Sequence, residues 1–167
     1  MATTCVAVLD FGSQTTQLIA RAVREANVYC EIFPYNVDVA TLGQFAPKAL
    51  ILSGGPASVI ADSSPKLNPH VAALGLPTLG ICYGMQAMVQ AAGGEVKSVS
   101  RREFGPADAQ QQQSSSLLAG IENTFRVWMS HGDQVVALPD GFQSYSRTET
   151  CPYVVIGNHA LRQFVVQ

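Results

Sequence analysis

Short apolar runs alternate with helix-like patterns through the first half of the chain. Residues 5–10 form a continuous apolar run that ends in a polar residue, which is typical of a buried parallel strand. Residues 15–26 place their apolar side chains on one helical face. The cycle repeats, with strands predicted at 28–33, 49–52 and 78–81 and helices at 37–45, 67–74 and 85–92. The alternation predicts an α/β fold, with a doubly wound, mostly parallel sheet flanked by helices.

The pattern changes after Gly93 and Gly94. Short strands joined by turns are predicted at 95–99, 125–129, 134–138, 142–148, 153–156 and 163–166. They indicate an antiparallel extension of the sheet in the C-terminal third. The glutamine and serine run at 110–116 is predicted to be a mobile surface loop without a chemical role, and Trp128 is predicted to lie in the core.

The carboxyl ends of the first strands carry polar or reactive residues. Asp10, Ser53 and Cys82 each follow a predicted strand, and ligands of such sheets bind beyond these ends. We therefore expect the three residues along one rim. Asp10, Ser13 and Gln14 are also interpreted as caps of the first helix.

The composition fits one globular domain of low surface charge. The chain has 167 residues, of which 47% are apolar and 13% charged. Its net charge of -2 gives no reason to expect nucleic acid or a membrane surface as a partner. No apolar run approaches the roughly 18 residues that a membrane span needs, and residues 1–4 show no signal-peptide pattern.

The four cysteines are scattered without a metal-ligand spacing. We therefore predict no disulfide, no metal site and a reducing, cytoplasmic environment. Cys5, Cys30 and Cys151 are interpreted as small core side chains, which leaves Cys82 to be explained.

Cys82 lies at the centre of a Gly-Ile-Cys-Tyr-Gly segment, between a predicted strand and a predicted helix. This is the pattern of a nucleophile elbow, in which a sharp, strained turn presents the central side chain above the sheet. The helix N-terminus there favours thiolate. The N–H of Tyr83 would face a developing oxyanion, and Gly54 or Gly55 could supply a second donor. A buried cysteine after a strand is more often inert, but the flanking glycines favour the catalytic interpretation.

Several segments resemble the class I glutamine amidotransferases and, more narrowly, the amidotransferase domains of GMP synthetases. They are Val-Leu-Asp-Phe-Gly-Ser-Gln at 8–14, Ile-Leu-Ser-Gly-Gly-Pro at 51–56, Leu-Gly-Ile-Cys-Tyr-Gly-Met-Gln at 79–86, Arg-Glu-Phe-Gly at 102–105, Val-Trp-Met-Ser-His-Gly-Asp at 127–133 and Thr-Glu-Thr-Cys-Pro at 148–152. The matches follow the family order across nearly the whole chain.

The resemblance implies that the Cys82 thiolate attacks the side-chain amide of L-glutamine, releases ammonia and forms a thioester that water hydrolyses. Gly55 and Tyr83 would supply the oxyanion hole. The substrate contacts it implies are Gly54, Gln86 and the predicted turn of Ser130, His131, Gly132 and Asp133. The ammonia would aminate XMP to GMP in an ATP-dependent synthetase domain or subunit, which would also hold ATP and Mg²⁺. No cofactor is expected in residues 1–167, and a homodimer of the full protein is compatible with the resemblance.

Two departures from the family pattern bear on activity. In the family, a strand like residues 163–167 is followed by Phe-His-Pro-Glu, which carries the base and its orienting carboxylate. The sequence ends at Gln167, so we expect a chain truncated before that segment and inactive by itself. The stretch between Gly105 and Phe125 is also shorter than in the family. Alternatives are a non-catalytic glutamine-binding scaffold, another class I amidotransferase or a different cysteine-elbow hydrolase.

Overall fold

The computed structural model describes residues 4–167, except for the side chains of residues 101–103. Most of the N-terminal segment assessed for a signal peptide therefore lies outside the described residues. The side chains of Arg102 and Glu103, which open one family motif, lie outside them as well.

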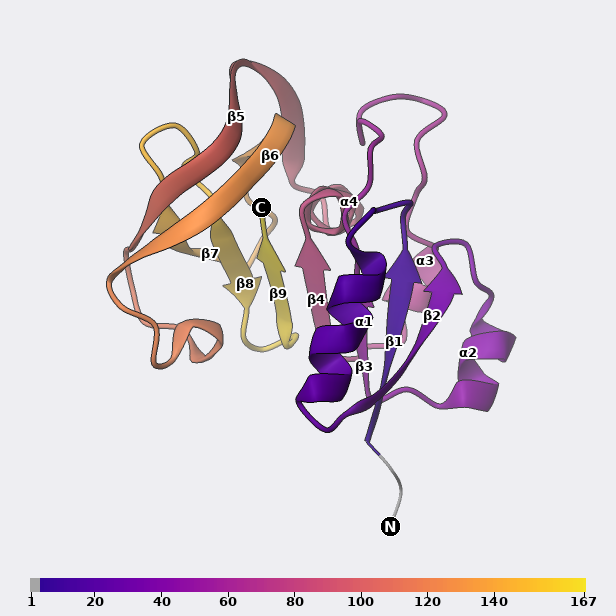
Figure 1. Cartoon of the computed structure of the whole chain (residues 1–167). Helices are drawn as coiled ribbons and strands as arrows, with labels where there is room; N and C mark the ends of the chain where they lie inside the picture. The colour runs from indigo at the N-terminus through magenta and orange to yellow at the C-terminus, as the bar shows by residue number, and fades with distance from the viewer. Residues whose placement is uncertain (1–3) are drawn as a thin grey trace.

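Nine strands form one mixed sheet in the order β2-β1-β3-β4-β9-β8-β7-β5-β6 (Figure 1). Their bounds are β1 Cys5–Asp10, β2 Tyr29–Pro34, β3 Ala49–Leu52, β4 Thr78–Ile81, β5 Glu95–Gln111, β6 Thr124–Ala137, β7 Gln143–Arg147, β8 Val155–Asn158 and β9 Gln163–Val166. Strands β2, β1, β3, β4 and β9 pair in parallel, and the remaining pairs are antiparallel. The predicted fold class is confirmed.

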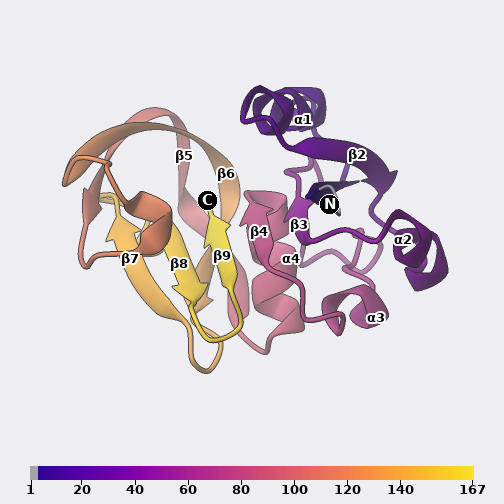
Figure 2. The same cartoon turned by 90° about the horizontal axis from the view of Figure 1, so that it is seen from below.

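The helices lie on both faces of the parallel half. α1 (Thr16–Glu25) covers one face, while α2 (Val39–Phe45), α3 (Pro69–Ala72) and α4 (Tyr83–Ala91) cover the other (Figure 2). Crossovers between parallel strands are right-handed, and the chain moves from β1 outward to β2 before returning through β3 to β4. The reversal of direction therefore puts α1 on the opposite face from the later helices. A doubly wound sheet binds its ligands near such a reversal.

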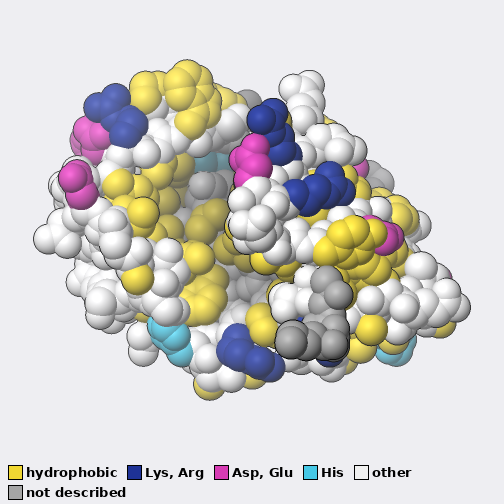
Figure 3. Space-filling model, turned by 60° about the horizontal axis from the view of Figure 1, so that its bottom comes forward, with side chains coloured by type: hydrophobic (Ala, Val, Ile, Leu, Met, Phe, Trp, Pro, Cys, Tyr) yellow, Lys and Arg dark blue, Asp and Glu magenta, His cyan; other side chains and the backbone are white. Residues whose placement is uncertain are grey.

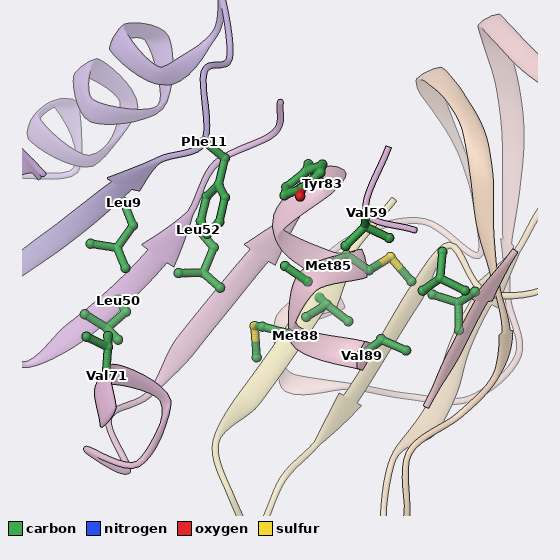
Figure 4. Close-up of a cluster of buried hydrophobic side chains, with 14 of the residues drawn as sticks. Leu9, Phe11, Leu50, Leu52, Val59, Val71, Tyr83, Met85, Met88 and Val89 are labelled. Carbon is green, nitrogen blue, oxygen red and sulfur yellow. The ribbon is translucent and has the colours of Figure 1, made fainter. Parts of the chain in front are cut away.

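The main core lies between the sheet and the elbow helix α4. Leu9, Leu50 and Leu52 of the sheet pack with Met85 and Val89 of α4 (Figure 4). A second core lies within the antiparallel half, where Met129, Tyr145 and Val155 are buried together. α4 is buried along most of its length, so its first turn has little freedom to move.

The C-terminal third differs from the prediction in its strand lengths. β5 and β6 are long paired strands, and β6 runs without interruption through Ser130–Asp133, so the turn predicted there is wrong. The pairing register shifts between Ser98 and Glu103 of β5, where residues 99–102 face only Gly132 of β6. The irregularity therefore lies on β5, and the partner strand stays extended.

Three smaller predictions are also corrected. Gln110 and Gln111 belong to β5 and pair with β7. Their side chains favour no particular secondary structure strongly, so pairing with the edge of β7 decided their conformation. Trp128 is 76% exposed, since β6 turns alternate residues inward and Met129 occupies the core face. The N-cap residue of α1 is Thr15, so none of Asp10, Ser13 and Gln14 occupies that position. The Ser13 hydroxyl accepts from the N–H of Thr15 in the preceding turn.

Charged side chains are sparse on the surface. In the space-filling view of Figure 3, hydrophobic and uncharged atoms dominate, and hydrophobic side chains line a hollow at the centre of that face. Within residues 4–167, no helix has both the length and the apolar character to span a bilayer.

Candidate active site

The ends of β1, β3 and β4 meet on one rim, as the sequence predicted. Leu9 pairs with Leu52, and Leu52 pairs with Gly80, so the three strands end side by side. Asp10, Ser53 and Cys82 therefore follow neighbouring strand ends. The loop after β3 adds further residues, and the facing wall comes from β6 and, through Phe104, from β5.

Cys82 occupies the strained conformation that a nucleophile elbow requires. Its φ is 52° and its ψ is -108°, which is outside the regions that ordinary residues prefer. Such a conformation costs on the order of 1–3 kcal/mol and persists only where the surroundings enforce it. A Cβ on Gly84 would lie 2.4 Å from the Leu52 carbonyl oxygen, and one on Gly80 would lie 2.8 Å from the Gly84 carbonyl oxygen. The flanking glycines therefore let the turn close tightly.

A cavity of about 260 Å³ opens beside Cys82. The predicted site residues that line it are Cys82, Gly55, Tyr83, Gln86, Ser130, His131, Gly132 and Asp133. Gly54 lies outside the lining, although a Cβ there would lie 3.6 Å from the Cys82 Cβ. Pro56, Ala57 and Phe104 also line the cavity, and the predicted site omitted them. Pro56 and Phe104 lie in the family motifs at 51–56 and 102–105, so the sequence did contain a signal that could have placed them in the site.

The Cys82 thiol is only partly exposed, and backbone groups surround it. Its S–H donates to the carbonyl oxygen of Ser130 at 3.8 Å, and the side-chain amide of Gln167 lies 4.0 Å from the sulfur. Burial raises the pKa of the Cys82 thiol, and the N–H of Tyr83 lowers it by a smaller amount. Burial therefore opposes the stabilisation of thiolate that we expect from the helix N-terminus.

Contacts with Asp133 join three parts of the cavity wall. The Gln86 side-chain amide donates to the Asp133 carbonyl oxygen at 3.0 Å, which ties α4 to β6. The Ser58 hydroxyl donates to the Asp133 carboxylate, which ties the loop after β3 to the same strand. His131 is 4% exposed in that strand. These contacts hold β6 against the elbow.

The two predicted oxyanion donors sit on well-supported backbone. A Cβ on Gly55 would lie 2.5 Å from the carbonyl oxygen of Phe11, so only glycine fits there without displacement. The Tyr83 hydroxyl donates to the Pro65 carbonyl oxygen at 2.6 Å, and its ring lies 5.4 Å from that of Phe11. The thiol of Cys82 and the backbone of Gly55 and Tyr83 line one cavity. A thiol with neighbouring backbone donors would suit acyl transfer from a small amide.

Comparison with known proteins defines the class of this chain. A family model described as glutamine amidotransferase class-I matches residues 7–167, so the chain belongs to that family. The motif-based resemblance is thereby confirmed.

Similar curated proteins are glutamine-hydrolysing GMP synthases. That of Maridesulfovibrio salexigens is 49% identical over 164 residues, which cover 97% of this chain and 32% of the relative. That of Paraburkholderia phytofirmans is 50% identical over 161 residues, which cover 92% of this chain and 31% of the relative. The chain spans about a third of the length of the curated relatives it matches.

Solved structures support the fold. A protein described as a GMP synthase subunit, from Thermoplasma acidophilum, superposes with a TM-score of 0.85 at 24% identity, covering 100% of this chain and 84% of the other. A glutamine amidotransferase from Thermotoga maritima gives a TM-score of 0.77 at 16% identity, covering 100% of this chain and 76% of the other. At these identities the likeness concerns the fold alone.

Proposed function

We propose that this domain hydrolyses L-glutamine to glutamate and ammonia through a covalent intermediate on Cys82. The observation that carries the proposal is the strained elbow, which holds the Cys82 thiol at a cavity that Gly55, Tyr83 and Gln86 also line. A metal is not needed for this chemistry, because a thiolate is itself a strong nucleophile.

The reaction follows from the positions of these groups. The thiol loses its proton to a base, and the sulfur attacks the amide carbon of glutamine. Negative charge develops on the former carbonyl oxygen, where the N–H groups of Gly55 and Tyr83 stabilise it. The carbon–nitrogen bond breaks, the nitrogen takes a proton, and ammonia leaves. Water then attacks the glutamyl thioester, which releases glutamate and returns the thiol.

The proton acceptor for the Cys82 thiol is the remaining part of the reaction. The Cys82 sulfur lies near the Ser130 carbonyl oxygen and the Gln167 side-chain amide, and neither group is a good base. In the family pattern, the base follows a strand like β9. The N–H of Cys82 donates to the Val166 carbonyl oxygen at 2.7 Å, so the end of β9 adjoins the thiol. A histidine just after this strand would be within reach of the sulfur. We therefore expect slow turnover by residues 1–167 alone.

We further propose that the ammonia is used to aminate XMP to GMP. The relatives named as glutamine-hydrolysing GMP synthases support this assignment, and they are about three times as long as this chain. An ATP-dependent synthetase domain or subunit would be the partner, and ATP and Mg²⁺ would bind there. Residues 1–167 would need no cofactor of their own, and they would act in a reducing cytoplasm.

Affinity labelling tests the glutaminase site without requiring rapid turnover. The probe is the chloroketone analogue of glutamine, in which a chloromethyl ketone replaces the amide, so that the thiolate displaces chloride and forms a carbon–sulfur bond. We expect one adduct by intact mass, on Cys82, with protection by L-glutamine. Cys82→Ala should abolish labelling, while Cys151→Ala, which changes a buried core cysteine, should not. Labelling that glutamine does not slow, or that Cys82→Ala retains, would refute the proposal.

A glutaminase assay separates catalysis from binding alone. Glutamate release above the uncatalysed rate, lost in Cys82→Ala, is expected even without an efficient base. Glutamine binding to both proteins with no release from either would support the alternative of a glutamine-binding scaffold, for which the raised pKa of Cys82 is the favouring observation.

A further inference from the structure

Ser53 connects the ends of β1 and β3 to the first turn of α4 through hydrogen bonds. The side chain is fully buried at the end of β3. Its hydroxyl accepts from the N–H of Phe11 at 2.9 Å and donates to the carbonyl oxygen of Gly54 at 2.8 Å. Its own N–H donates to the carbonyl oxygen of Leu9 at 3.0 Å, and its carbonyl accepts from the N–H of Gly84 at 3.0 Å. Both backbone polar groups and the hydroxyl of Ser53 are therefore engaged.

The bond to Gly54 controls the direction of a neighbouring N–H. The carbonyl of Gly54 and the N–H of Gly55 belong to one planar trans peptide, so they point in opposite directions. Fixing the carbonyl therefore fixes the N–H. Glycine stands on both sides of this peptide, and no side chain on either residue restrains its rotation. The Ser53 hydroxyl restrains the peptide through its bond to the Gly54 carbonyl oxygen, and the close approach of Phe11 to Gly55 adds to this restraint.

The N–H of Gly55 remains available to a ligand. Gly55 lines the cavity with Cys82, and no described residue accepts a hydrogen bond from its N–H. Rotation of the Gly54–Gly55 peptide would turn a carbonyl oxygen toward the cavity in its place. An oxygen there would repel a developing oxyanion instead of stabilising it.

We propose that Ser53 is a positioning residue that holds the Gly54–Gly55 peptide with the N–H of Gly55 directed at the oxyanion. The inference rests on the proposed glutaminase function. Ser53 also supports the second donor, because its carbonyl holds the first turn of α4, where Tyr83 begins the helix. Phe11, whose N–H Ser53 binds, packs its ring near that of Tyr83 (Figure 4). One serine thus aligns both donors.

The test compares two reagents on the same thiol at pH 9. Labelling by the chloroketone analogue requires its ketone oxygen in the oxyanion hole, whereas iodoacetamide requires only an accessible thiolate. Rates are measured by intact mass for the wild type, Ser53→Ala, Ser53→Thr and Ser53→Val. Threonine and valine have the same shape and differ by the hydroxyl, so any strain from the added methyl is common to both. Ser146→Ala removes an equally buried serine hydroxyl in β7, away from the cavity, and serves as the control.

Loss of one oxyanion donor slows acyl transfer by about 10²–10³ in enzymes. We expect Ser53→Ala and Ser53→Val to slow chloroketone labelling at least tenfold and to change the iodoacetamide rate less than about threefold. Ser53→Thr should label faster than Ser53→Val by a similar factor, even if both are less stable. Equal losses with both reagents, or equal rates for threonine and valine, would overturn the positioning role. A wild-type protein that the analogue does not label, or that glutamine does not protect, would instead refute the proposed function.

Discussion

Gly84→Ala tests whether the close approach of α4 to β3 builds the elbow. Alanine in a helix normally stabilises it by up to about 1 kcal/mol relative to glycine. Here the added Cβ would lie 2.4 Å from the Leu52 carbonyl oxygen and 2.7 Å from the Leu52 Cβ. Ordinary contacts begin near 3.4 Å, so the backbones must separate by about 1 Å, the difference between 3.4 and 2.4 Å.

The expected change in stability follows from three contributions. Overpacking costs about 1–3 kcal/mol, and loss of the 3.0 Å bond from the Gly84 N–H to Ser53 costs about 1 kcal/mol. The helix preference of alanine offsets about 1 kcal/mol. The net loss is about 2 kcal/mol, which lowers the ratio of folded to unfolded protein about thirtyfold. A shift of about 1 Å in the elbow should also slow chloroketone labelling about a hundredfold.

Urea unfolding followed by circular dichroism measures this change. The matched control is Gly43→Ala in α2, where an added Cβ meets nothing within 4 Å. The control should raise the free energy of unfolding by about 0.5–1 kcal/mol, since only helix preference acts there. If Gly84→Ala matches the wild type or gains stability like the control, the close approach does not hold the elbow.

Three further predictions concern the thiol, the cavity wall and the surface. Because burial raises the pKa of Cys82, the rate of its reaction with iodoacetamide should keep rising with pH beyond the titration midpoint of a free thiol. A titration midpoint below pH 7 would show that the helix N-terminus and the Tyr83 N–H outweigh burial. Gln86→Ala should lower the free energy of unfolding in urea by about 1 kcal/mol, since it leaves the Asp133 carbonyl without its 3.0 Å donor. The same change should weaken the protection that glutamine gives against chloroketone labelling, and unchanged protection would remove Gln86 from the binding site. Arg126→Ala should change stability by less than about 1 kcal/mol, and a larger loss would contradict the small effect expected of its exposed ion pair with Asp108.

Local pattern was sufficient for the parallel half and the elbow. Apolar runs alternating with helical periodicity predicted strands β1 to β4, because a strand buried on both faces needs continuous apolar residues whatever its neighbours are. Gly80 and Gly84 marked the turn at Cys82, since the lack of a Cβ is a property of those residues themselves. These signals depend on near neighbours in sequence, so they can be read directly.

The tertiary structure decided what depends on which distant segments meet. Ser130–Asp133 resembles a turn in sequence, yet its pairing with β5 keeps it extended, and the same pairing leaves Trp128 at the surface. The bonds of Ser53 were invisible in the sequence, because they join β1, β3 and α4 only after the sheet has formed. Burial of the Cys82 thiol likewise depends on distant segments such as Ser130 of β6, and this burial raises the pKa of the thiol. The sequence by itself determined the position of Cys82 at the elbow, whereas long-range packing determined the surroundings of its thiol.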